Sequence, residues 1–360
     1  MVQAAASDVF AVILAGGSGT RFWPRSRHHT PKQLCRIGSA DRTLVEGTLQ
    51  RLEGWIPPER RILVTHQDQL AQTQEICGDR VGTYLPEPKA CNTACALTLA
   101  ALEIQKKNPT GVMVSLHADH VIQNQAAFHA TLDRAVETAR QSFLTLVGIV
   151  PQYPETGYGY IEQGNPLSEH SHGFHVASFR EKPDVVTATT YVESGRFVWN
   201  SGIFVWTIST FLEEARAYIG EVVAPLEAVG ALFNTVPFSA WETAYSRTPA
   251  ISIDHGVLEK SHRIAVIPAT FDWLDVGSWG AMNRVTPGDA EGNLLFGDGV
   301  LLDCRNTTLD TDGPFIAGVG VEDLVIVASK GAILVCRKER DQDVKKVVEY
   351  LKTQHRNELL

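Results

Sequence analysis

The sequence predicts an α/β fold with a doubly wound, mostly parallel sheet, followed by a small β-rich domain that ends in a helix. From Val9 to about Trp279, short runs rich in Val, Ile, Leu and Phe alternate with amphipathic stretches. Strands buried on both faces and separated by helices have this pattern. After Pro287, short β-rich pieces alternate with Gly, Asp and Asn turns. We therefore expect an α/β domain over residues 1–286 and a β-rich domain over residues 287–360.

The individual elements follow from apolar runs and amphipathic periodicity. The expected strands of the first half are Val9–Ala15, Arg61–Thr65, Gly111–Leu116 and Phe143–Val150. The expected helices of the first half are Thr43–Leu52, Asp68–Cys77, Thr93–Lys106 and Gln125–Gln141. From about Tyr158 the pattern indicates strands that fold over the sheet, and a final helix is expected over Gln342–Leu351. Because ligands of open α/β sheets bind beyond the carboxyl ends of the strands, the loops after Ala15 and Leu116 should face the active site.

The composition argues against several classes of protein. The 360 residues are 44% hydrophobic and 20% charged, as in an ordinary globular protein. A formal net charge of -9 argues against non-specific binding to nucleic acid or to a membrane surface. No run approaches the roughly 18 apolar residues of a membrane span, and the N-terminal apolar run lacks the basic flank of a secretory signal. The six cysteines are scattered, so we expect reduced thiols in a cytoplasmic protein.

The strongest functional motif is a glycine-rich loop with basic residues, LAGGSGTRFWPRSRHHTPKQ over Leu14–Gln33. Glycines let backbone amides approach a phosphate closely, and Arg21, Arg25 and Lys32 would supply the charge that a triphosphate needs. A Walker A loop would need Lys followed by Ser or Thr after its last glycine, and a dinucleotide motif would need Gly where Phe22 stands. The alternative is an ordinary tight turn with basic surface residues.

The same segment resembles the signature of the sugar-nucleotide pyrophosphorylases, Gly-Gly-x-Gly-Thr-Arg-Leu-x-Pro followed by Pro-Lys. Trp23 and the PKQ ending are similar to the branch of that family that uses GTP and mannose 1-phosphate. The resemblance covers nearly the whole chain and implies a nucleotidyltransferase in which Arg21 and Lys32 are catalytic. It implies nucleotide contacts from the loop and from a later segment, Tyr84–Leu97, by Leu14, Ala15, Gly16, Gly17, Gly19, Thr20, Arg21, Glu87, Asn92 and Thr93.

The later segment departs from the family at two positions. Cys91 stands where Arg is usual, and Cys95 stands where Pro is usual. The loss of that Arg removes one possible phosphate contact, which makes the choice of guanine the least supported part of the substrate prediction.

Two aspartates are candidate Mg²⁺ ligands. Asp119 follows an apolar strand in SLHADHVI, and Asp275 precedes a Gly-Ser turn in TFDWLDVGSW. Carboxylates at such a site are suitable Mg²⁺ ligands, but a helix N-cap or a turn cap explains each residue as well, and Asp272 competes with Asp275. The resemblance implies that Asp119 and Asp275 hold Mg²⁺ and that Asp119 also contacts the substrate. His117 stands where the family usually has Pro.

Three further segments are candidates for the sugar phosphate: TGYGYIE, FREKPD and VWNSGIFVW. A lysine at a strand end can reach an anionic oxygen, and polar side chains in a buried strand need partners, which sugar hydroxyls could supply. A surface turn and a purely structural asparagine are the alternatives. The resemblance implies that Lys182 binds the sugar phosphate and that the sugar is contacted by Gly157, Glu162, Glu181 and Asn200. Arg180 replaces an apolar residue of the family, and His255 is expected to be structural because a phosphate oxygen needs no general base.

The implied reaction is in-line attack by an oxygen of mannose 1-phosphate on the α-phosphorus of GTP, which yields GDP-mannose and diphosphate. The resemblance also implies a nucleotide-diphospho-sugar transferase fold, a tail that forms a short left-handed β-helix, and a homodimer. The alternatives are another sugar phosphate or base, and a catalytically inactive regulatory relative. An acyltransferase with a long β-helix, or a bifunctional isomerase, would need more chain than the tail supplies.

Overall fold

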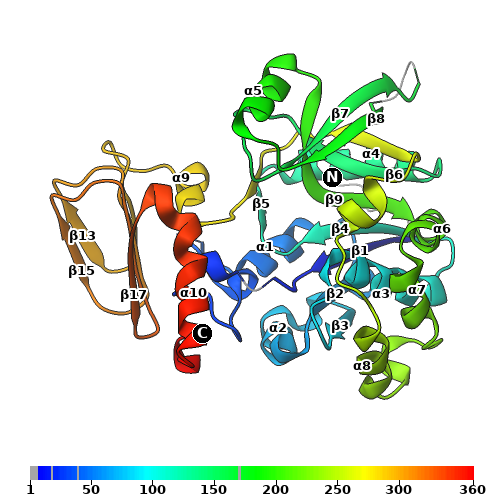
Figure 1. Cartoon of the computed structure of the whole chain (residues 1–360), viewed down its shortest axis with the longest axis horizontal. Coiled ribbons are helices and arrows are strands. Elements are labelled where there is room, and N and C mark those ends of the chain that lie inside the picture. Colours follow the sequence, from blue (N-terminus) through cyan, green and yellow to red (C-terminus); the bar gives the residue numbers. More distant parts are fainter. Residues whose placement is uncertain (1–6, 18, 39, 169–171) are drawn as a thin grey trace.

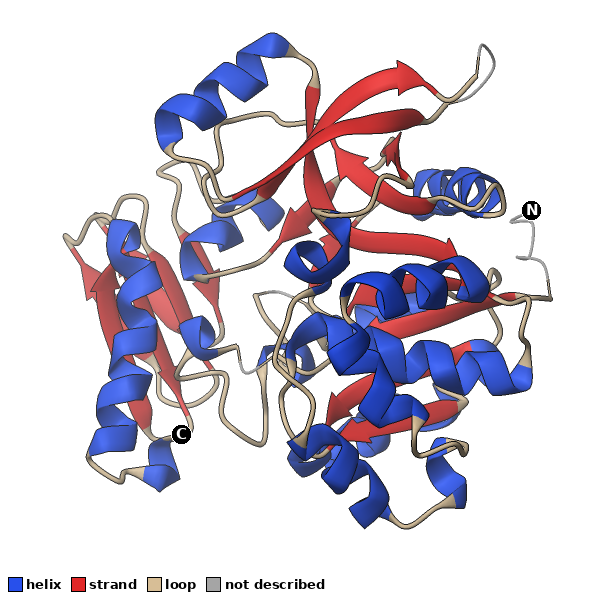
Figure 2. Cartoon of the chain, turned by 45° about the vertical axis from the view of Figure 1, so that its right-hand side comes forward, coloured by secondary structure: helices blue, strands red, loops and turns tan. Residues whose placement is uncertain are grey.

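The computed structural model of the chain describes residues 7–17, 19–38, 40–168 and 172–360. Within these residues a nine-stranded sheet forms the centre of the α/β part, in the order β3-β2-β1-β4-β9-β6-β10-β8-β7 (Figures 1 and 2). The strands of this sheet are β1 (Val9–Leu14), β2 (Arg61–His66), β3 (Thr83–Glu87), β4 (Val112–His117), β6 (Leu144–Ile149), β7 (Gly159–Pro166), β8 (Phe174–Glu181), β9 (Phe197–Thr207) and β10 (Ile264–Pro268).

The sheet has a parallel half and a mixed half. Strands β3, β2, β1 and β4 pair in parallel, and so do β6 and β10. Strand β9 runs antiparallel between β4 and β6, and β7 and β8 form an antiparallel pair beyond β10. The predicted doubly wound α/β sheet is confirmed, and its four predicted strands lie within one residue of the observed bounds.

Helices cover both faces of the sheet, which explains why its central strands are apolar throughout. On β1, Val12 belongs to a core cluster that includes α3, α6, α7 and α8, whereas Ile13 belongs to the cluster on the other face with α1 and α4. Side chains of successive strand residues point to opposite faces. The helices are α1 (Leu44–Arg51), α2 (Leu70–Cys77), α3 (Asn92–Lys107), α4 (Gln125–Ala139), α5 (Val185–Ser194), α6 (Ile208–Tyr218), α7 (Gly220–Glu227), α8 (Phe238–Ser246), α9 (Met282–Val285) and α10 (Val344–Thr353).

Local sequence signals set the ends of several helices. Helix α1 begins after Thr43, whose hydroxyl accepts a hydrogen bond from the N–H of Glu46, while the Glu46 carboxylate accepts one from the N–H of Thr43. This reciprocal capping box satisfies two backbone donors. Asn124 caps α4 with a single bond, because its side chain accepts a hydrogen bond from the N–H of Ala127. No helix among the described residues is long and apolar enough to cross a membrane.

The C-terminal part is built from short strands in two stacks (Figure 1, orange). One stack has the order β12-β14-β16-β17, with the first three strands parallel and β17 antiparallel, and the other pairs β13 with β15 in parallel. Its strands are β12 (Leu294–Phe296), β13 (Gly299–Leu302), β14 (Thr308–Thr311), β15 (Ile316–Val319), β16 (Leu324–Ser329) and β17 (Ala332–Arg337). Helix α10 packs on this unit, and a third core cluster joins it to Phe22 and Trp279 of the α/β part.

Candidate active site

The glycine loop after β1 (Gly16, Gly17 and Gly19) lies against Lys32 at Gly19. Gly19 has φ +58°, and a Cβ at this position would overlap Cβ of Lys32 and lie 2.8 Å from its backbone nitrogen. The Ser26 hydroxyl donates a hydrogen bond of 2.6 Å to the Gly19 carbonyl. Only glycine fits this conformation and this space without strain, so the loop and Lys32 pack as one unit.

Lys32 is buried and lies between the two predicted metal ligands. Its Nζ donates to Asp119 Oδ2 at 2.8 Å and lies 3.7 Å from Asp275 Oδ1. The two aspartates meet because β5 (His120–Ile122) pairs antiparallel with β11 (Trp273–Asp275), with His120 opposite Asp275. A short two-stranded ladder therefore joins carboxylates that are far apart in the sequence.

The charges at this point fit a divalent cation. Burial raises the pKa of Asp275, with Lys32 opposing the rise and the nearby Asp119 carboxylate adding to it. Burial also acts to raise the pKa of Asp119, but the Lys32 ammonium group opposes it, and this pKa lies well below its usual value. The single ammonium group of Lys32 does not neutralise both carboxylates, so negative charge remains. The side chains of Asp119 and Asp275 are 32% and 35% exposed. Such a pair suits a hard cation that prefers oxygen ligands.

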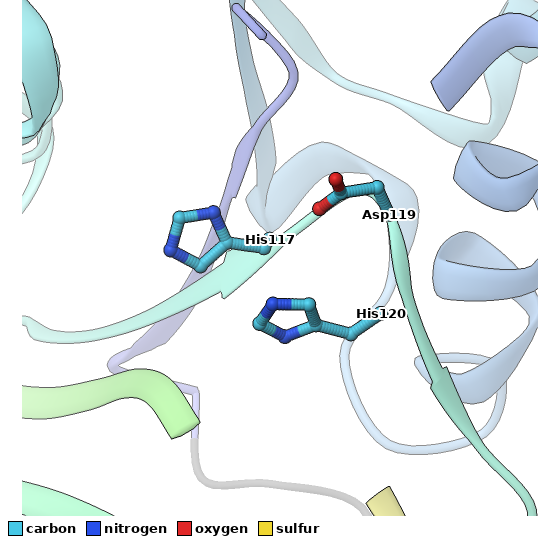
Figure 3. Close-up of side chains that lie close together, drawn as sticks. All are labelled: His117, Asp119 and His120. Atoms are coloured by element: carbon cyan, nitrogen blue, oxygen red, sulfur yellow. The ribbon is translucent and has the colours of Figure 1, made fainter. Parts of the chain in front are cut away.

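His117 and His120 lie beside Asp119, and the three ligand atoms are within 4.8 Å of one another (Figure 3). Trp273 Nε1 donates to His120 Nδ1 at 3.2 Å, and burial lowers the pKa of His120 well below its usual value. The neutral ring therefore carries its proton on Nε2, and its acceptor nitrogen is occupied. The site's available ligands are thus the two aspartates rather than His120.

A first cavity, of about 260 Å³, opens beside the glycine loop. Six of the ten predicted nucleotide contacts line it: Leu14, Gly16, Gly17, Glu87, Asn92 and Thr93. The parallel pairing of β2 and β3 puts Glu87 at the strand end, opposite His66. Thr93 is fixed because its hydroxyl accepts a hydrogen bond of 2.9 Å from the N–H of Ile253. Gln33, which sequence reasoning did not assign, also lines this cavity and donates to the Ala15 carbonyl at 2.6 Å.

Glu87 is the buried acid of this cavity. It is 7% exposed, and the Tyr245 hydroxyl donates to Glu87 Oε1 at 3.2 Å. Burial raises its pKa to about 8, although the hydrogen bond from Tyr245 opposes the rise. At neutral pH the carboxyl is therefore mostly protonated, and it can both donate and accept a hydrogen bond.

A second cavity, of about 450 Å³, adjoins the first, and Asp119 lines both. The predicted sugar contacts Gly157, Glu181, Lys182 and Asn200 line it together with Asp275. Lys182 has φ +49°, and its Nζ donates to Glu181 Oε1 at 2.8 Å. This lysine side chain is 62% exposed, so it is free to reorient toward an anion.

Asp254 is a residue of this cavity that sequence reasoning missed. Asn200 Nδ2 donates to Asp254 Oδ1 at 2.8 Å, and the N–H of Gly202 donates to Asn200 Oδ1 at 3.1 Å. The amide of Asn200 is therefore held by partners on both sides. The available signal was the acidic residue before His255 in the ISIDHGVLEKS segment, Asp254 itself. His255 is exposed, lines the same cavity and pairs with Glu259 at 2.7 Å.

Several predicted residues lie elsewhere. Glu162 lines neither cavity and contacts Ser178 and Arg196. Asp272 is exposed and lines a separate cavity. Arg25, expected among the phosphate-binding cations, is instead paired with carboxylates of the C-terminal part.

The remaining members of the signature also stay outside the cavity walls. The Ala15 carbonyl is occupied by hydrogen bonds from Gln33 and Thr65, and Gly19 packs on Lys32. Thr20 faces a different cavity. Arg21 is exposed, and its guanidinium would be 3.7 Å from a Cβ added at Gly277, two residues after Asp275. Arg21 is thus near Asp275, although it does not line either cavity.

The two departures at the start of α3 are buried thiols. Cys91 and Cys95 are both fully buried in the core cluster of that sheet face, and Cys91 Sγ lies 3.7 Å from the Thr248 carbonyl. The position where the family has Arg therefore brings no positive charge to this cavity.

Comparison with known proteins assigns the chain to a family. The family model described as nucleotidyl transferase matches residues 10–292. The chain belongs to the nucleotidyl transferase family. Residues 297–351 match a second model, the MannoseP isomerase/GMP-like beta-helix domain, which agrees with the parallel stacks of the C-terminal part of this nucleotidyl transferase.

Curated relatives and solved structures agree with this assignment. A mannose-1-phosphate guanylyltransferase of Klebsiella pneumoniae is 38% identical over 356 residues, and one of Escherichia coli K12 is 37% identical over 368 residues. The alignments cover 96% and 98% of this chain and 74% and 76% of those proteins. A crystal structure from Thermus thermophilus, described as a mannose-1-phosphate geranyltransferase, superposes with a TM-score of 0.86 at 33% identity, covering 96% of this chain and 99% of that one. The chain is therefore a nucleotidyltransferase with the predicted fold.

Proposed function

We propose that this nucleotidyltransferase transfers GMP from GTP to mannose 1-phosphate, releasing diphosphate. The observation that carries the proposal is that Asp119 lines both cavities, one beside the glycine loop and one beside Lys182. A nucleotide in the first cavity and a sugar phosphate in the second would meet at Asp119 and Lys32. The guanylyltransferase names of the curated relatives support the choice of GTP and mannose 1-phosphate.

The proposed reaction needs positioning and charge stabilisation rather than a covalent intermediate. A phosphate oxygen of the sugar phosphate attacks the α-phosphorus, a new P–O bond forms, and the bond to the bridging oxygen of diphosphate breaks. The amides of Gly16 and Gly17 face the triphosphate, and Arg21 lies at the edge of the same site. Lys32 neutralises the charge that develops at the α-phosphate, and Lys182 orients the sugar phosphate.

Mg²⁺ is the proposed cation, held by Asp119 and Asp275. Bound there, it would supply charge neutralisation for the phosphate oxygens. Lys32 lies beside both carboxylates, and its contact with Asp119 fixes the ammonium group at the junction of the two cavities.

We propose that the sugar hydroxyls are recognised by Glu181 and Asn200, with Gly157 forming part of the wall. Glu162 lies on β7 and does not line the cavity, so it would act on the sugar site only indirectly. The division into domains of residues 1–286 and 287–360, the homodimer and the cytoplasmic location stay predictions. A nucleotidyltransferase with another sugar phosphate or base is the second candidate, because Cys91 supplies no cation near the nucleotide.

Equilibrium binding tests the assignment of the two cavities. Calorimetry on Lys182→Met should give a Kd for mannose 1-phosphate raised at least tenfold and a Kd for GTP within twofold of wild type. Glu87→Gln should change the Kd for GTP and leave that for mannose 1-phosphate unaltered. The opposite pattern, with Lys182→Met weakening GTP alone, would contradict the assignment.

A further inference from the structure

The segment that follows the glycine loop, Thr20–Cys35, is attached to the C-terminal β domain by polar contacts, of which those of Trp23 and of Arg25 with Asp310 are partly buried. Arg25 Nε donates to Asp310 Oδ1 at 2.6 Å, and Arg25 Nη1 donates to Asp312 Oδ2 at 2.5 Å. Asp310 on β14 is fully buried, and the Arg25 side chain is 16% exposed. An ion pair shielded in this way has a fixed geometry and responds weakly to salt.

Two neighbours of Arg25 make further contacts with the C-terminal part. Trp23 Nε1 donates to the Leu359 carbonyl at 2.8 Å, and Arg27 donates to the same carbonyl and to that of Ser329 at 3.4 Å. Ser329 in turn donates its hydroxyl to Asp312 Oδ2 at 2.8 Å. Trp23, Arg25 and Arg27 thus all contact the C-terminal part, and these three residues are called the clamp.

The clamp is connected to Lys32 through Ser26 and Gly19. Ser26 stands between Arg25 and Arg27, and its hydroxyl donates to the Gly19 carbonyl. Gly19 packs against Lys32, and Lys32 contacts Asp119. A displacement of Arg25 would therefore be passed through Ser26 to Gly19 and from there to Lys32.

The C-terminal β domain also contacts the segment that follows Asp275, the second proposed metal ligand. Asp341 accepts a hydrogen bond of 2.7 Å from the N–H of Gly280, and Trp279 Nε1 donates to the Trp23 carbonyl at 3.3 Å. Val276, which follows Asp275, shares the third core cluster with Phe22 and with apolar residues of β16 and α10. Both halves of the site thus rest on one core that the C-terminal domain completes.

We propose that Arg25 is a positioning residue for nucleotidyl transfer, through which Asp310 and Asp312 of the β domain hold the glycine loop and Lys32 in place. The kinetic part rests on the function proposed above. The domain then contributes to the active site of its own chain, independently of any role between copies of the chain.

Hydrogen exchange tests the positioning without reference to turnover. In Arg25→Met, amides of residues 19–34 should exchange at least tenfold faster than in wild type, while those of α4 stay unchanged. The matched control is Arg337→Met, which removes an exposed ion pair with Glu339 in the same domain and should leave both regions unchanged. Equal exchange over residues 19–34 in wild type and Arg25→Met would overturn the inference, whatever the substrates prove to be.

Steady-state kinetics separate positioning from general stability. Arg25→Met should raise the KM for GTP and lower kcat, each at least fivefold, with the KM for mannose 1-phosphate within twofold of wild type. Arg25→Lys, which can still pair with one carboxylate, should recover part of the loss. A wild-type kcat and KM for GTP in Arg25→Met, or an equal rise in both KM values, would overturn the inference. If Arg25→Met does not fold, Asp312→Asn removes one of the two contacts and should produce the same changes at smaller size.

Discussion

Lys32 Nζ lies 2.8 Å from Oδ2 of Asp119, a residue that lines both the cavity beside the glycine loop and the cavity beside Lys182. The lysine comes from the segment after β1 and the aspartate from the end of β4, so neighbouring parallel strands deliver both groups to the same edge of the sheet. This arrangement makes the ammonium group the nearest fixed positive charge to the point where the two substrates would meet.

Replacing this ammonium group should reduce turnover far more than stability. Lys32→Met is expected to lower kcat by about 10²–10³, the range for loss of a preorganised charge at the reacting phosphate. The methionine keeps most of the buried stem, so thermal unfolding should shift by only a few degrees. The measurements are kcat and Tm, with Lys346→Met on the exposed side of α10 as the control. An unchanged kcat would exclude the role assigned to Lys32.

Replacing either metal-site carboxylate should weaken the dependence on cation. Asp119→Asn and Asp275→Asn should each need at least tenfold more Mg²⁺ for half-maximal activity, because each removes one anionic oxygen ligand. Asp272→Asn is the matched control, since Asp272 is exposed and lines another cavity. A titration of activity with Mg²⁺ checks this, and a shift in Asp272→Asn alone would move the assignment to that residue.

Gly19 and Gly17 should differ sharply in their tolerance of a side chain. Gly19→Ala forces a residue with φ +58° against the backbone of Lys32 and should cost about 2 kcal/mol or more in the free energy of unfolding. Gly17→Ala meets no atom within 4 Å, so its stability should stay within about 0.5 kcal/mol of wild type. Urea unfolding of both variants measures the difference. Equal stability would mean that the loop relaxes away from Lys32.

The buried Glu87 should make stability fall as pH rises. Its pKa is about 8 in the folded chain and about 4.3 when unfolded. Between these values the folded state keeps a proton that the unfolded state releases, so the stabilising contribution is complete below about pH 4.3 and is lost as pH rises to 8. Relative to Glu87→Gln, wild type should lose up to about 1.4 kcal/mol per pH unit in this window. A difference between the two proteins that stays constant from pH 5 to pH 8 would show that Glu87 is ionised throughout.

The sequence was sufficient to predict β1, β2 and β4 of the parallel half and β6 of the mixed half, but it did not predict β3. The runs at Val9, Arg61, Gly111 and Phe143 are apolar because both faces of those strands are covered, and burial on both faces leaves a pattern that can be read from one chain. Strand β5, of three residues, has no such run of its own. Its partner β11 lies about 150 residues later, and only tertiary contact makes the ladder between them.

Site residues that belong to motifs at strand ends could be predicted from the sequence. Residues whose role depends on a partner from another segment could not. Glu87, Asn92, Asp119 and Lys182 were found because they belong to recognisable segments, and they line the cavities. Asp254 was not predicted as a site residue because its role depends on a contact with Asn200, which is distant in the sequence. Arg25 was misassigned to phosphate because a cation in a glycine-rich segment looks the same whether it faces a ligand or a carboxylate 285 residues away.

Product formation from defined substrate pairs tests the proposed transfer most directly. Diphosphate release should be measured with each of the four nucleoside triphosphates, with mannose 1-phosphate or glucose 1-phosphate, in the presence of Mg²⁺. We expect release with GTP and mannose 1-phosphate to exceed every other pair by at least tenfold, and to fall by about 10²–10³ in Lys32→Met. Faster release with another pair would contradict the proposed substrates, and release that persists in Lys32→Met would contradict the site.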